Sequence, residues 1–125
     1  KGISTIVSLL GETDHDLLCG ALSILIFMST EEQAHTEAIE SGLIPSLNMA
    51  IELNDSTELQ QRVLQTITHY VTDSDTRNKL LDTSILSKII SLLESRDRKV
   101  RLGACSATVN LCQVNVYQNL NLSIK

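Results

Sequence analysis

Apolar positions follow the period of a helix, and the same apolar pattern returns about every forty residues. Residues 3–10 (ISTIVSLL), 44–51 (IPSLNMAI) and 86–93 (LSKIISLL) align without gaps, at offsets of 41 and 42 residues. Within each segment apolar residues recur three and four positions apart, which places them on one face of a helix. The alternation of two that a half-buried strand requires is absent. The pattern therefore predicts an all-α chain built from repeats.

Capping residues and chain breakers set the expected limits of the helices. Thr13 or Asp14 is a candidate N-cap for the second helix, Thr30 for the third, and Asp73 or Ser74 for the sixth. Pro45 falls in the first turn of a helix, where its missing N–H is tolerated. The turn at residues 54–56 precedes a long helix. The predicted helices cover residues 3–11, 14–28, 31–40, about 44–53, 57–72, 75–82, 85–94, 98–113 and 117–124.

A period of about forty residues made only of helices indicates a solenoid of stacked repeats. No single unit of this size buries its own apolar face, so neighbouring units have to share one core. We expect residues 1–29 to be the end of one repeat, residues 30–72 and 73–113 to be two full repeats, and residues 114–125 to start another. Both ends carry apolar residues where a capping repeat would be polar, so we expect an excerpt of a longer solenoid.

Two segments resemble armadillo repeats. Residues 40–47 (ESGLIPSL) are similar to the turn before the second helix of that family, and residues 104–111 (ACSATVNL) to its third helix. The resemblance covers almost the whole chain. It implies a right-handed α-solenoid of three-helix repeats, each with a short first helix, a second helix and a long third helix. HEAT repeats are the alternative, but they lack the short first helix that residues 31–40 and 75–82 supply.

The resemblance also implies a binding face. In armadillo proteins the third helices line a concave groove, where a partner lies in extended form. The peptide receptors of the family carry a Trp and, four residues later, an Asn on each third helix. Only one Asn is kept here and no Trp, which disfavours a receptor of the nuclear-import type. The Trp positions fall on Ser23, Gln65 and Ser106, and the Asn positions on Phe27, His69 and Asn110.

Extending these positions towards the start of each helix completes a predicted partner-binding groove of twelve residues. Within it, Phe27 is expected to tuck between helices and His69 to face water. A basic cluster lies just before and within the third of these helices and consists of Arg96, Arg98, Lys99 and Arg101. It is either a binding site for an acidic peptide or an ordinary solvent-exposed helix start. The twelve groove residues are Asp16, Cys19, Ser23, Phe27, Glu58, Gln61, Gln65, His69, Lys99, Leu102, Ser106 and Asn110.

Charge and composition narrow the class of partner. The net charge is −5 and aromatic residues make up 2% of the chain, so neither a phosphate backbone nor stacked bases are favoured as ligands. Residues 1–62 carry ten acidic and two basic residues, whereas residues 63–125 carry five acidic and eight basic residues. The longest apolar run, residues 24–28, is too short to span a membrane. We predict a protein or an extended peptide as partner, besides neighbouring repeats, with no nucleic acid and no membrane.

Motifs for catalysis, metals and cofactors are missing. The three histidines fall in different parts of the repeat pattern with no HExxH motif, and the five glycines are scattered and form no phosphate-binding loop. Gly20 and Gly103 occupy equivalent positions and predict close helix packing. Cys105 and Cys112 are seven residues apart on one helix, about 10.5 Å, which is too far for a disulfide. We expect Cys19, Cys105 and Cys112 to be buried reduced thiols.

The sequence thus predicts a non-catalytic scaffold for protein–protein interaction. It needs no cofactor and no metal, and its reduced thiols indicate the cytoplasm, with the nucleus or a cytoskeletal or ciliary location as alternatives. Two other functions stay open. One is a structural solenoid component of a cytoskeletal or ciliary assembly, and the other is a regulatory array within a larger multidomain protein.

Overall fold

The computed structural model describes residues 2–53 and 56–124, and it describes side chains for residues 2–52 and 56–112. Helices make up this part of the chain, and it contains no strand, as predicted. The expected turn at Asn54 and Asp55 lies outside the described residues. The elements are α1 (Gly2–Ser8), η1 (Leu9–Gly11), α2 (His15–Met28), α3 (Glu32–Glu40), α4 (Leu43–Leu53), α5 (Thr57–Tyr70), α6 (Ser74–Leu81), α7 (Ile85–Ser91), η2 (Leu92–Glu94) and α8 (Arg98–Ile124).

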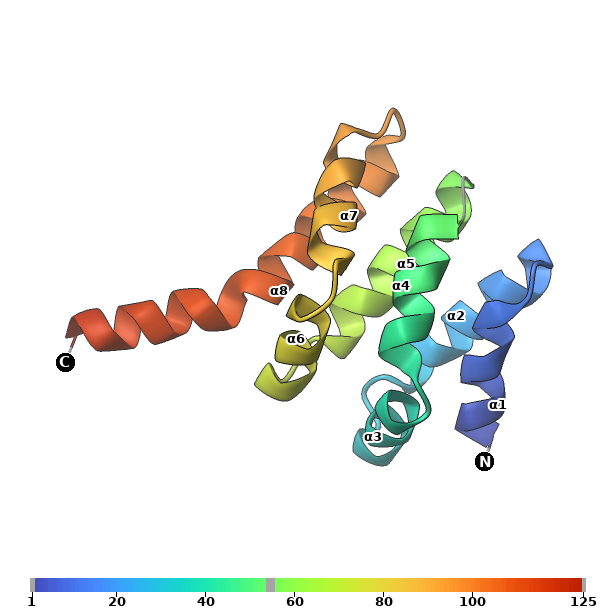
Figure 1. Cartoon of the computed structure of the whole chain (residues 1–125), viewed down its shortest axis with the longest axis horizontal. Coiled ribbons are helices and arrows are strands. Elements are labelled where there is room, and N and C mark those ends of the chain that lie inside the picture. The colour runs from blue at the N-terminus through green and yellow to red at the C-terminus, as the bar shows by residue number, and fades with distance from the viewer. Residues whose placement is uncertain (1, 54–55, 125) are drawn as a thin grey trace.

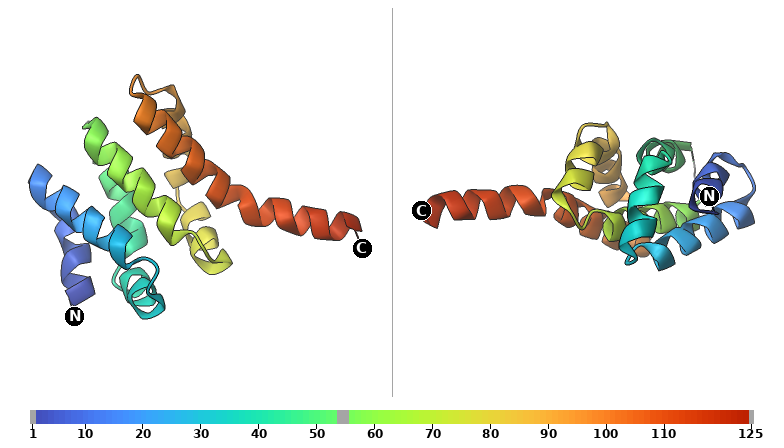
Figure 2. Two further views of the ribbon diagram at one scale, coloured as in Figure 1. Left: turned by 180° about the vertical axis from the view of Figure 1, so that it is seen from behind. Right: turned by 90° about the horizontal axis from the view of Figure 1, so that it is seen from below.

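Most of the helices lie in two layers, and a short helix begins each full unit and crosses between them. One layer holds α1, α4 and α7, and the other holds α2, α5 and α8 (Figures 1 and 2). In Figure 1 the short helix α3 is seen nearly end-on while α4 lies in the plane of the picture. The order of a short helix, a second helix and a longer third helix occurs twice, in α3–α4–α5 and α6–α7–α8. The predicted right-handed solenoid of three-helix units is confirmed.

Carboxylate and hydroxyl side chains begin most of these helices. Asp14 accepts a hydrogen bond from the Leu17 N–H at 3.1 Å, and Asp73 accepts one from the Thr76 N–H at 3.0 Å. Each bond satisfies a backbone donor that the first helical turn leaves unpaired. Thr30 was expected to cap the next helix, but Glu31 accepts the Ala34 N–H at 3.1 Å instead. The helix starts one residue later because residues 29 and 30 still form a turn.

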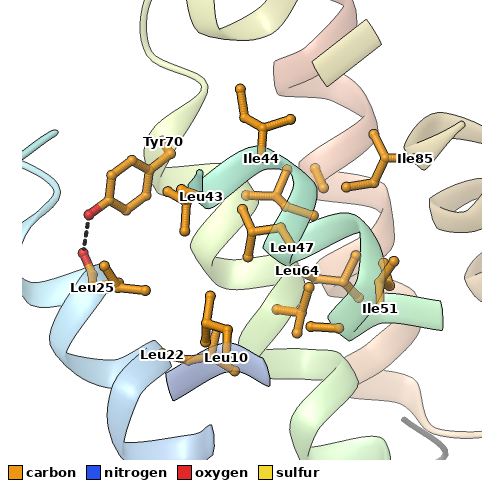
Figure 3. Packing of buried hydrophobic residues seen from close by; sticks show 14 of the residues in the cluster. Leu10, Leu22, Leu25, Leu43, Ile44, Leu47, Ile51, Leu64, Tyr70 and Ile85 are labelled. Carbon is orange, nitrogen blue, oxygen red and sulfur yellow. Dashed lines mark hydrogen bonds between the residues drawn. The ribbon is translucent and has the colours of Figure 1, made fainter. Parts of the chain in front are cut away.

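One core runs through all the units. In Figure 3, Leu25 of α2 lies near Leu43 of α4, Leu22 of α2 lies beside Leu10, and Leu47 of α4 lies beside Leu64 of α5. The aligned positions that defined the repeat have matching surroundings. Ile3 and Ile44 are buried, and Leu86 is half-buried against the same core. No unit is complete without its neighbour, as the repeat pattern predicts.

Polar contacts also join each unit to the next at the spacing of the repeat. The Tyr70 hydroxyl donates to the Leu25 carbonyl at 2.8 Å across 45 residues (Figure 3). Lys88 Nζ donates to Asn48 Oδ1 at 2.6 Å across 40 residues and lies 3.0 Å from Glu52 Oε2. Because hydrogen bonds are directional, these contacts help to set how each unit is aligned with the next, and they also stabilise the stack.

Gly103 confirms the expected close packing, whereas Gly20 does not. A Cβ atom at position 103 would lie 3.3 Å from Leu64 Cβ, so α8 approaches α5 closely at this point. At Gly20 no heavy atom of the described chain would lie within 4 Å of such an atom. The equivalent sequence positions therefore meet different neighbours.

The end of the chain differs from the prediction. Helix α8 is continuous from Arg98 to Ile124, although the sequence predicted an end at Gln113 and a new helix from Tyr117. Residues 104–124 contain neither Gly nor Pro, so nothing in that stretch stops a helix once it has begun. In Figure 1 the last part of α8 projects beyond the stack. The repeat boundary placed at residue 113 stays a prediction, but no break in the helix marks it.

Candidate functional site

The twelve predicted groove residues lie on the three long helices, four on each of α2, α5 and α8, and none of them is buried. These helices lie side by side in the left view of Figure 2. We call the surface formed by the twelve residues the third-helix face. It brings together side chains up to 94 residues apart in sequence, from Asp16 to Asn110. Whether a partner binds there stays a prediction.

A hollow of about 260 Å³ opens on this face between α5 and α8. Six of the twelve predicted residues line it. Gly103 is part of its wall, and Leu102 supplies an apolar wall that is 50% exposed. The remaining lining groups are an amine, an imidazole, two amides and two hydroxyls. The complete lining is Gln61, Gln65, Thr68, His69, Lys99, Leu102, Gly103 and Ser106.

Asn110 is less available than the sequence implies. Its Nδ2 donates to the Thr68 carbonyl of α5 at 3.2 Å, and the residue is half-buried. The close approach of α5 and α8 thus uses one of its donors inside the stack. His69 is exposed as predicted, and its Nδ1 lies 2.8 Å from the Gln65 carbonyl one turn earlier in the same helix.

The prediction that Phe27 tucks between helices is wrong, because its side chain is 84% exposed. The buried stripe of α2 consists of Leu18, Ala21, Leu22 and Leu25. Phe27 follows Leu25 by two residues, which is a rotation of about 200° around a helix and points it away from that stripe. Together with Ile24, which is 43% exposed, it leaves an apolar edge on α2.

The thiols are also more exposed than predicted. Cys105 is exposed, and Cys19 and Cys112 are half-buried; all three are free. Cys105 directly follows Ala104, a member of the buried stripe of α8, and so falls beside the core and not in it. Burial raises the pKa of the Cys19 thiol, and the nearby carboxylates of Glu58 and Asp16 raise it further, against the lowering effect of Arg62.

Part of the basic charge is engaged within the fold. Arg101 Nη1 donates to the Ser95 and Arg96 carbonyls at 2.8 and 3.1 Å, so this guanidinium holds the loop before α8. Arg98 and Lys99 are exposed beside it. On the acidic half, Arg62 Nη2 lies 3.5 Å from Glu58 Oε2, and its Nη1 donates to the Ser23 hydroxyl. Arg62 and Arg101 are thus held in contacts within the fold, whereas Arg98 and Lys99 are exposed basic residues at the start of α8.

A larger hollow, of about 890 Å³, lies between α3 and α6 near the carboxyl ends of α2 and α5. Sequence reasoning did not predict it. His35 lines it and stacks on Tyr70 with ring centroids 4.9 Å apart. Its Nε2 lies 3.2 Å from Asp73 Oδ1 and 3.4 Å from Thr76 Oγ1. His35 and Thr76 are 41 residues apart, so the repeat offset was the signal that could have paired them.

His35, Asp73 and Thr76 do not form a catalytic triad. In a triad the nucleophile and the acid contact opposite nitrogens of the imidazole, whereas both oxygens here face Nε2. Thr76 is buried and its hydroxyl donates to Asp73 Oδ1 at 2.8 Å. Burial acts to raise the pKa of Asp73, but the hydrogen bonds from Thr76 and the nearby His35 outweigh it and lower the pKa. The arrangement caps α6 and ties it to α3.

Replacing Asp73 with Ala is expected to cost about 1 kcal/mol at neutral pH, because α6 loses its cap. The lowered pKa of Asp73 means that its contribution is present above the unfolded pKa of about 3.9 and disappears as the pH falls through the folded value. The difference between wild type and variant should therefore shrink in acid. Urea unfolding at several pH values measures it, and a difference that stays constant down to pH ~3 contradicts this role.

A cluster of possible metal ligands was also missed by the sequence analysis. His15, Cys19 and Glu58 each place one donor atom within 4.8 Å of the others. Glu58 lies on the helix that follows in the layer, so no short sequence motif contains all three. The prediction that the chain needs no metal considered only ligands close together in sequence, and not ligands that neighbouring helices bring together.

Comparison with known proteins identifies the fold. The sequence matches no family model and no curated protein. An engineered protein of known crystal structure matches with a TM-score of 0.81 and 22% identity, over 87% of this chain and 46% of that chain. A designed armadillo repeat protein matches with a TM-score of 0.79 and 20% identity, over 86% and 46%. Another, in complex with the peptide (KR)4, matches with a TM-score of 0.79 and 17% identity, over 87% and 46%.

The chain therefore has an armadillo-type repeat fold, and it spans just under half the length of these three structures. In the part of the chain that the structure describes, every helix is too short or too polar to cross a membrane.

Proposed function

We propose that this chain is a non-catalytic protein–protein interaction scaffold, and that an extended segment of the partner binds along the third-helix face. The observation that carries the proposal is the hollow between α5 and α8. Its walls come from side chains about forty residues apart, and six of them belong to the set that the armadillo resemblance selects. An exposed Leu surrounded by amides and hydroxyls suits a partner with one apolar side chain and a backbone that needs hydrogen bonds.

The charges of the third-helix face give the partner a direction. Asp16 and Glu58 lie at the α2 and α5 end, and Lys99 lies on α8. A partner segment with basic residues over α2 and α5 and acidic residues over α8 meets complementary charge along its length, which sets orientation more than affinity. The similar designed protein that binds (KR)4 offers a precedent for a basic peptide on this fold.

The scaffold differs from a receptor with an aromatic ladder. Ser23, Gln65 and Ser106 stand at the Trp positions, so these positions supply no aromatic ring to hold a lysine or arginine stem. We infer that affinity comes from Leu102 and from hydrogen bonds to the partner backbone. We further propose that the chain acts in the cytoplasm, which is consistent with three free thiols.

Peptides selected on the wild-type chain from a phage-displayed random library test this function. Their affinity for purified chain is measured by fluorescence anisotropy. The double variant Gln65→Ala/Leu102→Ala is expected to weaken binding at least about tenfold, which corresponds to about 1.4 kcal/mol. Both side chains are exposed, so the stability of the variant should change by only about 0.5 kcal/mol. Asn110 is left intact because its amide also joins α8 to α5.

A matched control changes exposed apolar residues of the other layer. Met49 on α4 and Ile90 on α7 are 55% and 47% exposed, and the variant Met49→Ala/Ile90→Ala should bind the selected peptides as wild type does. If instead this control loses binding and the α5/α8 variant keeps it, the third-helix face is not the binding surface. That result would favour the alternative of a structural component that uses the opposite layer.

A further inference from the structure

We propose that His15, Cys19 and Glu58 bind a zinc-type divalent metal ion between the amino ends of α2 and α5. His15 and Cys19 are four residues apart on α2, so their side chains lie on one face of that helix, one turn apart. Glu58 comes from the first turn of α5, the next helix in the layer. The bound ion would thus bridge two successive units of the stack.

The donor atoms lie near the separations that a tetrahedral ion requires. Zinc bonds of about 2.0–2.3 Å to nitrogen, oxygen and sulfur separate neighbouring ligand atoms by about 3.3–3.8 Å. His15 Nε2 lies 3.4 Å from Glu58 Oε1 and 4.0 Å from Cys19 Sγ. All three donors fall within 4.8 Å of one another. The separation of His15 Nε2 and Glu58 Oε1 lies within the range that zinc requires, whereas Cys19 Sγ has to come closer to Nε2 by rotation of a side chain.

Neighbouring side chains are placed to orient two of the ligands. His15 Nδ1 lies 3.8 Å from Asp16 Oδ1, which is too far for a hydrogen bond, but the negative charge of this carboxylate favours a proton on Nδ1 and leaves Nε2 for the metal. Arg62 Nη2 lies 3.5 Å from Glu58 Oε2, so the other oxygen, Oε1, faces His15. Ser56 Oγ lies 3.3 Å from His15 Nε2 and marks the side where a fourth ligand or a water molecule fits.

The chemistry of the donors selects the ion. One imidazole, one thiolate and one carboxylate suit zinc or cobalt, whereas magnesium and calcium prefer oxygen ligands only. The side chains of His15 and Glu58 are 45% and 55% exposed, so an ion can reach them from solvent. Three protein ligands leave one position open, as in exchangeable zinc sites and not in closed structural ones.

Titration of the full chain with zinc chloride by calorimetry tests the site, with cobalt(II) as a spectroscopic probe. We expect one ion per chain and a cobalt spectrum that combines a thiolate charge-transfer band with the strong visible bands of tetrahedral coordination. Cys19→Ser should abolish the charge-transfer band, and Glu58→Gln and His15→Ala should each weaken binding more than about 100-fold. Asp16→Asn, which removes only the orienting carboxylate, should weaken binding about tenfold.

Two controls separate this site from surface binding. Cys105→Ser removes an exposed thiol, and Glu32→Gln removes an exposed carboxylate of α3; both should leave affinity and spectrum unchanged. Circular dichroism checks that each variant folds, which is expected because none of the three ligands is fully buried. No zinc binding by the wild type, a charge-transfer band that survives Cys19→Ser, or equal binding of magnesium would each overturn the proposal. The test needs no peptide, so its result is independent of the proposed scaffold function.

Discussion

Replacing Leu64 with Ala is expected to lower the free energy of unfolding by about 2–5 kcal/mol. The side chain is fully buried, and it faces Gly103 of α8, whose Cβ position lies 3.3 Å from Leu64 Cβ and 3.4 Å from Leu64 Cδ1. The gap left by the shorter side chain cannot be filled from α8, because glycine has no side chain to move into it. The loss therefore falls on the interface between two units.

Urea unfolding followed by circular dichroism measures this change. A domain of this size is stable by about 5–15 kcal/mol, so the variant should unfold at a much lower urea concentration. Leu17→Ala provides the matched control, since Leu17 is 45% exposed on α2 and its truncation should change stability by only about 0.5 kcal/mol. Equal midpoints for the two variants would mean that Leu64 is not an interface residue.

Replacing Tyr70 with Ala is expected to cost about 3–5 kcal/mol, the range for large aromatic side chains in a core. Tyr70 is 1% exposed and contributes in two ways. Its ring stacks on His35 of α3, and its hydroxyl donates to the Leu25 carbonyl near the carboxyl end of α2. It thus joins α5 to α2 of the preceding unit and to α3 of its own unit. Thermal and urea unfolding of the purified variant measure the loss.

Tyr70→Phe separates the ring from the hydroxyl and should cost only about 1 kcal/mol, the usual value of one buried hydrogen bond. Burial raises the pKa of Tyr70 to about 12. Because the folded state keeps the phenol protonated, this contribution is complete below the unfolded pKa of about 10 and is lost as the pH rises towards the folded value. The gap between wild type and Tyr70→Phe should narrow above pH ~10. A gap that does not change between neutral and alkaline pH would contradict the buried hydroxyl.

Both substitutions test how much a single interface between helices contributes to the stability of the whole chain. Leu64 links α5 to α8 through packing alone, whereas Tyr70 links α5 to α2 and α3 through packing and a directional bond. A solenoid has no central core that could compensate for a weak interface, since each unit contacts only its neighbours. Loss at either interface should therefore appear in the unfolding of the whole chain.

Much of the fold was predictable because it depends on local periodicity. The aligned segments that begin at Ile3, Ile44 and Leu86 fall on α1, α4 and α7, and Asp14 and Asp73 cap the helices they were expected to cap. A helix face and a cap each depend on residues within about four positions of each other. Such information is present in the chain before any two units meet. None of the twelve predicted groove residues is buried, but these positions were selected by the resemblance to armadillo repeats and not by the period alone.

Other features depend on what a neighbouring unit places nearby. The period alone did not show on which side of the buried stripe Phe27 and Cys105 fall. Nor did it show that Asn110 would donate to Thr68, since that bond needs the close approach of α8 to α5 at Gly103. Helix α8 extends beyond its predicted end because residues 104–124 contain no glycine or proline. The sequence contains no stop signal there, so the repeat pattern was the wrong guide.

The sequence by itself determined that the chain is helical and that it repeats about every forty residues. These properties follow from the spacing of apolar side chains along one helix. Only the tertiary structure decided which polar groups meet across the stack: His15 and Cys19 with Glu58, His35 with Asp73 and Tyr70, and the lining of the hollow between α5 and α8. These contacts depend on how neighbouring helices are rotated and how far apart they lie, and both are set by the packing of one helix surface against the next.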